Sequence, residues 1–494
     1  MAAALMAGLG LLPAVLQAQS LRVTPSVTVS ETFTNNVGQA AVGQASDAIS
    51  RVDLGLGLRS RLGVVQGFLD YSLTGLAYAR QSERNGRQQH LSSRGEVEWY
   101  ERRGYLELSS SIGQAALSAF GVQPGASGLA NANTTEVRNL RIAPSWRGQF
   151  GPDLAYSIKA EYGLSSTQDS QVGDSHSTAV SAHLGSARAT RLGWSLGASH
   201  SESSYSAGRS TSSDRLLGGG SLQLSEFDLQ LSASAGMERS NLTSLSSGSS
   251  ATWGLGAVWA PSPRTQLSAQ FEDRPFGKTH SLSLQHRTPL TVWTLSDTTT
   301  LSTNGNQLGS ASSASLYDLF YVQFASVEPD PIKRADLVNS YLRSFFPNYV
   351  ASVPSGLLSA AASVLRNTSL SVAARGARST ATLTLSRSVT RRADTISTGV
   401  DELSASPSIV SKNIALNLAH RLTPLSNLNL SLAWQDSRGS QLAQSLKQRT
   451  ALLQYSDQWA KNLNLSLALR RTLYETALLP FSESALVLGA GLRF

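Results

Sequence analysis

Two short stretches carry residue types that could do chemistry. GWSLG, residues 193–197, matches the nucleophile-elbow pattern around Ser195, which requires a sharp turn from a strand into a helix. SHSES, residues 199–203, places His200 near Glu202 as a potential acid/base or ligand pair. Ser195 instead lies within an alternating strand pattern, and no second cluster supplies further ligands at a recognisable spacing. We therefore predict no catalytic residue, metal or cofactor. A hydrolase whose site residues come from different strands stays an alternative, because such a site leaves no linear motif.

A second kind of candidate consists of charged residues that alternate with apolar ones. If the apolar residues face outward, these charges face an interior, where they could select anionic polymers or solutes. Rows of paired charges can equally stabilise a barrel interior without any role in selecting solutes, and both interpretations stay open. The candidates are Arg59, Arg61, Glu96, Glu98, Arg141, Arg147, Lys159 and Glu161.

The elements that must position these residues follow a period of two along most of the chain. In NLNLSLALR, residues 462–470, leucines occupy every second position and Asn, Ser, Ala and Arg occupy the others, so the two sets lie on opposite faces of a strand. Such segments have the length of membrane-spanning strands, about 9–11 residues. A soluble sandwich would have shorter strands, about 5–6 residues, and larger inward side chains. The pattern favours leucines facing lipid and small polar groups facing a wet interior.

Strands that cross a bilayer must form a closed sheet, because unpaired backbone amides there cost several kcal/mol each. Tight turns alternate with longer loops along the chain, as in outer-membrane barrels. Counting hairpins predicts an all-β fold, a closed antiparallel transmembrane β-barrel of about 22 strands, an even number. The last strand ends at Phe494, and a terminal aromatic after alternating apolar residues resembles the signal for outer-membrane barrel assembly.

Composition argues against nucleic acid as a partner, and the N-terminal stretch predicts export. Charged residues make up only 15% of the 494 residues, cysteine is absent, and the net charge of +8 comes from scattered basic residues without a Lys/Arg-rich run. Residues 1–18 have the length and apolar character of a signal peptide. We expect the barrel to comprise residues 19–303 and 367–494.

The period changes between residues 304 and 366. Apolar residues there recur at helical spacing, and Asp330 with Pro331 forms a helix start, so we predict a mainly helical insert. Barrels of about 22 strands commonly hold a plugged lumen, which favours an insert that fills or caps the lumen. The alternative is a small core among the helices themselves. The predicted apolar face comprises Leu316, Leu319, Phe320, Phe324, Tyr341 and Phe345.

Two stretches suggest relatives. VTVSETFTNNV, residues 27–37, resembles the first strand and loop of the outer-membrane barrels associated with PEP-CTERM/exosortase systems, although Asn35 stands where an acidic residue is expected. YDLFYVQFASVEPDPIKRADLV, residues 317–338, resembles the helical insert of those proteins. The resemblance implies a role in exopolysaccharide export.

These observations together predict a porin-like conduit in the outer membrane of a Gram-negative bacterium, without covalent chemistry. The expected partners are outer-membrane lipid and lipopolysaccharide, the barrel assembly machinery, and exopolysaccharide with its export proteins. A barrel hydrolase acting on lipid or polysaccharide, and a surface receptor or adhesin acting through the long loops, are the alternatives.

Overall fold

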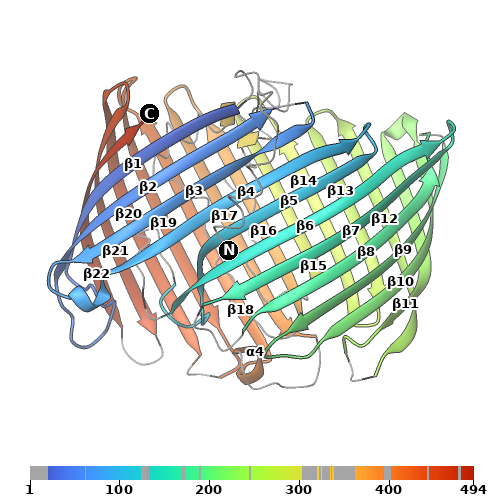
Figure 1. Cartoon of the computed structure of the whole chain (residues 1–494), viewed down its shortest axis with the longest axis horizontal. Coiled ribbons are helices and arrows are strands. Elements are labelled where there is room, and N and C mark those ends of the chain that lie inside the picture. The colour runs from blue at the N-terminus through green and yellow to red at the C-terminus, as the bar shows by residue number, and fades with distance from the viewer. Residues whose placement is uncertain are drawn as a thin grey trace.

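The computed structural model describes residues 21–61, 63–123, 131, 133–168, 173–188, 191–243, 246–302, 320, 321, 324, 334, 337, 338, 362–393, 402–441, 444–476 and 480–494. Within these residues a single antiparallel sheet of 22 strands closes on itself (Figure 1). The strands are β1 Leu21–Thr34, β2 Asp47–Arg61, β3 Val65–Tyr78, β4 Gly86–Tyr100, β5 Gly104–Ala116, β6 Thr134–Phe150, β7 Leu154–Thr167, β8 Ser175–Ser186, β9 Leu192–Tyr205, β10 Thr211–Leu224, β11 Leu229–Ser240, β12 Gly248–Ser262, β13 Thr265–Arg274, β14 Gly277–Arg287, β15 Thr291–Ser302, β16 Ser363–Arg375, β17 Ser379–Arg392, β18 Ser408–Arg421, β19 Ser426–Arg438, β20 Ser445–Ala460, β21 Leu463–Thr476 and β22 Phe481–Arg493. The predicted strand count and closed antiparallel architecture are confirmed.

Closure depends on the pairing of the first strand with the last. β1 pairs with β2 on one side and with β22 on the other, where Thr34 lies opposite Ala485 and Ser26 opposite Arg493. The amide of Phe494 adds one more bond, donating to the carbonyl of Pro25 at 3.0 Å. Because every described strand has two neighbours, the sheet exposes no edge to hydrocarbon.

The leucine-rich face of each strand is the outer face of the barrel. Leu54 and Leu56 on β2 are 49% and 39% exposed, and their register partners on β3 are Leu73 and Tyr71. The alternate positions of β2, including Gly55 and Gly57, point inward. This arrangement follows from the period of two, because a closed sheet places all residues of one parity on one side.

Tryptophans mark the two rims of the outer face. Near the ends joined by short turns lie Trp99, Trp146, Trp194, Trp259, Trp293 and Trp459, whereas Trp253 and Trp434 lie toward the opposite ends of β12 and β19. Trp99, Tyr100 and Trp146 pack as a cluster with ring centroids 5.1–6.2 Å apart. Aromatic belts at both rims delimit the band that lipid covers.

The two ends of the barrel differ in their connections. Short turns such as residues 151–153 and 461–462 join strands at the end where β1 begins and β22 ends, and longer loops such as residues 35–46 and 117–133 join them at the other. We call these the short-turn end and the long-loop end. Figure 1 shows the C-terminus at the upper, short-turn end and α4, Glu402–Ala405, at the lower, long-loop end.

The mainly helical insert is not confirmed. Outside residues 303–361, the helical elements of the described chain are α4 and the 3-10 turns η2 Ser82–Arg84 and η3 Ser225–Phe227, and no helix in the described residues is long and apolar enough to cross a bilayer. Of the predicted insert, most lies outside the described residues, although Phe320, Tyr321 and Val338 are in helical conformation. The segment also ends earlier than expected, since β16 already begins at Ser363.

Candidate functional site

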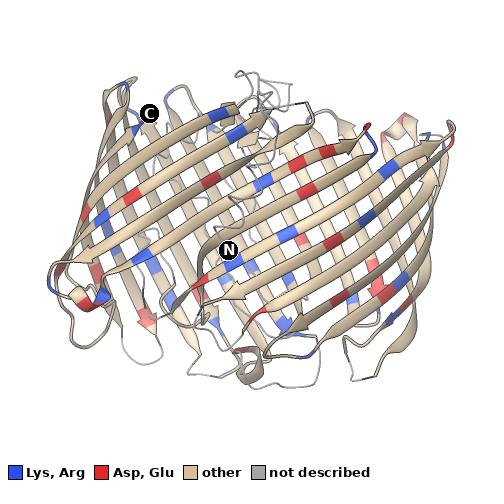
Figure 2. Ribbon diagram, in the orientation of Figure 1, with Lys and Arg blue, Asp and Glu red and all other residues tan. Residues whose placement is uncertain are grey.

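The interior wall of the barrel is polar and carries charges of both signs. Inward positions hold mainly Ser, Thr, Gly, Asn and Gln, as in β9, where the inward Ser195 and Ser199 alternate with the outward Leu196 and Ala198. Figure 2 shows Lys and Arg interspersed with Asp and Glu over the strands. Water can therefore wet the wall, and its charged side chains of opposite sign can form ion pairs with one another.

Four of these charges form one network on β5, β6 and β7. Arg141 holds Glu161 through two parallel bonds, Nε to Oε1 and Nη2 to Oε2, each 2.5 Å long. Its Nη1 lies 3.5 Å from Oε2 of Glu107, which also accepts from Lys159 Nζ at 3.2 Å. A bidentate arginine–carboxylate pair is geometrically specific, so this network fixes its members on the wall.

The other charged residues predicted to face the lumen lie outside this network. Arg59 pairs with Asp70 at 2.6 Å and lies over the ring of Phe68, at 5.2 Å from its centroid. Arg147 lies 4.0 Å over the ring of Tyr105. Glu96 and Glu98 occupy inward positions of β4, and Glu98 accepts a bond from the Arg102 amide at 2.6 Å. Arg61 is the last residue of β2, and its side chain lies outside the described residues.

Sequence reasoning missed several carboxylates that complete these pairs. Glu107 lies between Leu106 and Leu108, and Asp70 between Leu69 and Tyr71, so the same alternation would have placed both inward. Two further ion pairs that were missed join β10 and β11 to β13. Arg274 holds the fully buried Glu238 at 2.9 Å, and Arg215 holds Glu272 at 3.0 Å.

A loop spans the mouth of the barrel at the long-loop end. Ser118 and the amide of Ala119, in the loop between β5 and β6, both donate to the Glu402 carboxylate of α4, the amide at 2.9 Å. Ala119 and Phe120 pack against the buried Leu365, Leu403 and Ile409. β5 lies roughly opposite β16–β18 in a ring of 22 strands, so this loop reaches across the opening to the far wall. We call this contact the mouth bridge.

Described residues of the insert lie deep in the molecule. Phe320, Phe324 and Val338 are at most 1% exposed, and the two phenylalanine rings are stacked with centroids 6.2 Å apart. The guanidinium of Arg375 lies 4.9 Å from the centroid of Phe324. The insert joins the barrel at Ser302 and Ser363, at the long-loop end, whereas Arg375 is the last residue of β16, at the short-turn end.

The filling of the lumen is uneven. The inward residues Ser363, Ser371 and Ala373 of β16 are at most 1% exposed, whereas Ser195 and Ser199 on β9 are exposed. The buried inward residues belong to β16, the strand that ends at Arg375, and the ring of Phe324 packs against Arg375. Leu316, Leu319, Tyr341 and Phe345, the remaining members of the predicted apolar face, lie outside the described residues.

The two motifs at residues 193–197 and 199–203 lie on a strand, as the alternating pattern predicts. Ser195 lies within β9, without the strand-to-helix turn that a nucleophile elbow needs. His200 contacts Asp214 through Nδ1 at 2.6 Å, and both side chains point away from the lumen by the register of β9 and β10. Within the described residues, no group of three or more His, Asp or Glu could hold a metal ion.

The closed sheet, its outer apolar band and its wet interior define a transmembrane β-barrel of the outer-membrane type. No family model matches the sequence, and no curated protein matches it. Among solved structures, the siderophore receptor PirA from Pseudomonas aeruginosa has a TM-score of 0.45 at 9% identity, over 96% of this chain and 80% of that one. The FrpB iron transporter from Neisseria meningitidis (F5-1 variant) has a TM-score of 0.47 at 12% identity, over 96% and 83%. At these values the likeness carries no argument about function.

Proposed function

We propose that this protein is an outer-membrane conduit for polar solutes that rests in a closed state. The observation that carries the proposal is the alternation of the strands, which places leucines on the outside of a closed barrel and hydroxyl, amide and charged groups inside. Lipid solvates the first set and water the second. Short turns and the C-terminus then lie in the periplasm, and the long loops lie outside the cell.

The closed state is inferred from two features that obstruct the lumen. The mouth bridge crosses the outer opening through Glu402 and Phe120. Phe324 packs on Arg375 at the other end of the barrel from the insert's attachment points, which supports a plug rather than an external appendage. Passage then requires displacement of these groups by a partner or a solute.

Exopolysaccharide is the cargo we propose, together with a link to the PEP-CTERM/exosortase system. The support is the resemblance of residues 27–37 and 317–338 to barrels of that system. The hydroxyl-rich wall adds to it, since Ser199 and Ser201 of β9 are exposed and could hydrate a sugar chain. Export proteins of the polysaccharide pathway would be partners, and Phe494 would present the assembly signal at the periplasmic rim.

Sugar flux through reconstituted protein tests the conduit. Purified barrel, placed in liposomes, is expected to give slow swelling in oligosaccharide solutions, and a variant lacking residues 304–361 is expected to give much faster swelling. Equal impermeability of parent and variant, with correct folding shown by heat-dependent gel mobility, would overturn the conduit. Labelling of the folded parent by a serine-directed probe would favour the hydrolase instead.

The inner charge network makes a prediction about ion selectivity. Arg141→Ala removes one cation, leaves Glu161 without its bidentate partner and leaves Glu107 paired with Lys159 alone. When this substitution is made in the variant that lacks residues 304–361, the reversal potential should shift toward cation selectivity. Arg59→Ala should give a smaller shift, because only Asp70 loses its ion-pair partner. Unchanged reversal potentials in both variants would show that these charges serve the stability of the wall alone.

A further inference from the structure

The outer face of the barrel carries an uneven charge at its long-loop end. On β17–β21, seven described cations point outward within five residues of that end, against two carboxylates, Asp436 and Glu475. The cations, which we call the cationic belt, are Arg387, Arg391, Lys412, Arg438, Lys447, Arg449 and Arg471. Outward charges on the opposite wall, β6–β10, are Glu136, Arg138, Glu202 and Asp214 in the same zone of the described strands. Positive charge is therefore concentrated on one side.

The carboxylates of the belt do not neutralise it. Asp436 is held by Arg438 at 2.8 Å, and Glu475 is shared by Lys447 at 3.5 Å and Arg449 at 3.1 Å. Among the described residues, no carboxylate lies within ion-pair distance of the other four belt cations. These are Arg387, Arg391, Lys412 and Arg471.

Two of these cations face each other directly. The register of β17 and β18 places Arg387 opposite Lys412, and both are exposed. On its other side Lys412 lies opposite Asp436, which is already held by Arg438. Like charges directly opposite on neighbouring strands destabilise a sheet. An external anion bound between them would turn this repulsion into two attractive contacts.

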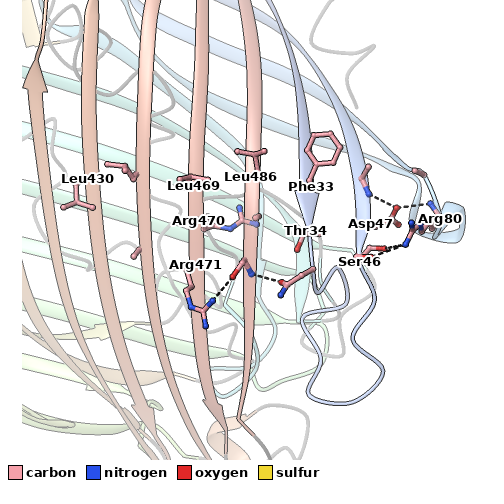
Figure 3. Close-up of a pocket in the computed structure, with 17 residues that line it drawn as sticks. Phe33, Thr34, Ser46, Asp47, Arg80, Leu430, Leu469, Arg470, Arg471 and Leu486 are labelled. Carbon is pink, nitrogen blue, oxygen red and sulfur yellow. Dashed lines mark hydrogen bonds between the residues drawn. The ribbon is translucent and has the colours of Figure 1, made fainter.

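An apolar groove adjoins the belt on the same outer face. It has a volume of about 1010 Å³ and includes Phe33, Leu453, Leu469, Leu486 and the small Ala451 in its lining. Figure 3 shows Leu469, Leu486 and Phe33 side by side on neighbouring strands, with Leu430 beyond one intervening strand and Arg471 beside Leu469 toward the loops. Arg471 is fixed there by its bond to Ser484 Oγ at 3.0 Å. The groove therefore ends in a cation.

We propose that the cationic belt and this groove form a binding site for lipopolysaccharide, with phosphates of its glycolipid head on the belt and an acyl chain in the groove. The inference rests on the proposed orientation, which places the long-loop end in the outer leaflet. Basic residues at a membrane surface attract anionic lipid heads, and arginine recognises phosphate with paired donors. A groove of this size is at the upper end for small-ligand sites, which fits an acyl chain.

Binding of purified lipopolysaccharide to the full-length barrel in a neutral detergent tests the site. The variant Arg387→Gln/Lys412→Gln/Arg449→Gln/Arg471→Gln should lose affinity by about 100-fold or more, given four cations at the surface. The matched control Arg87→Gln/Arg138→Gln/Arg239→Gln/Lys278→Gln removes four exposed cations elsewhere on the outer face and should bind within about two-fold of the parent. Ala451→Trp, which fills the groove, should also weaken binding, and dephosphorylated lipopolysaccharide should bind the parent weakly.

Equal losses in the belt variant and the control would overturn the site in favour of general charge attraction. Equal binding of phosphorylated and dephosphorylated lipid would overturn the phosphate assignment. Heat-dependent gel mobility and liposome swelling of the same preparations separate this inference from the conduit. A barrel that folds and conducts without a preference for lipopolysaccharide refutes the lipid site alone.

Discussion

Cutting the mouth bridge is expected to raise the open probability of the reconstituted barrel. The Glu402 carboxylate accepts from Ser118 and from the Ala119 amide, and Phe120 packs against Leu365 and Ile409 on the far wall. In Phe120→Ala/Glu402→Ala the loop loses both its anchor and its apolar contact. Single-channel recording in planar bilayers should then show openings several times more frequent than those of the parent.

A matched control is Glu83→Ala, which removes an exposed carboxylate from another connection at the same end of the barrel. This variant should record like the parent. If the bridge variant also does so while remaining folded, the mouth bridge does not obstruct the pore. The obstruction would then have to come from the groups that pack near Arg375 on the inner wall.

The second large effect concerns the ion pair beside the closing seam of the barrel. Arg470 on β21 donates to Glu483 on β22 at 2.7 Å, their side chains are 6% and 2% exposed, and Thr34 of β1 donates to the same carboxylate oxygen at 2.9 Å. Glu483→Ala leaves a buried guanidinium without its carboxylate. We expect the free energy of unfolding to fall by about 3–5 kcal/mol, the usual cost of breaking a buried pair.

The double variant Arg470→Leu/Glu483→Leu removes both charges and should recover much of that loss, because apolar replacements of a buried pair are often tolerated. Asp153→Ala breaks an exposed pair with Arg188 and should cost no more than about 1 kcal/mol. Urea unfolding in lipid bilayers measures all three. A loss in Glu483→Ala no greater than that in Asp153→Ala would contradict the assigned role of the pair.

The strands could be predicted from the sequence because their information is local. The alternation at Leu463, Leu465, Leu467 and Leu469 already assigns every residue of β21 to a face, and the turn spacing gives the strand count. Inward charges such as Arg141 and Lys159 followed from the same rule. Their partner Glu107 could have been found in this way as well, because its neighbours Leu106 and Leu108 are apolar.

The contacts between distant loops could not be predicted in this way. Ser118 and Glu402 are 284 residues apart, and no period or spacing connects them, because their proximity depends on closure of the whole ring. The cationic belt was missed for a related reason. Arg387, Lys412 and Arg471 break the apolar pattern one strand at a time, and only the register brings them to one side of the barrel.

Single-cysteine scanning of β9 tests most directly whether leucines face lipid and serines face water. The chain has no cysteine, so a spin label at each position from Leu192 to Tyr205 reports one site alone. In liposomes, collisions with oxygen should peak at even positions such as Leu196, and collisions with a water-soluble nickel complex should peak at odd positions such as Ser195. Uniform accessibility of both faces to the nickel complex would contradict a lipid-embedded barrel.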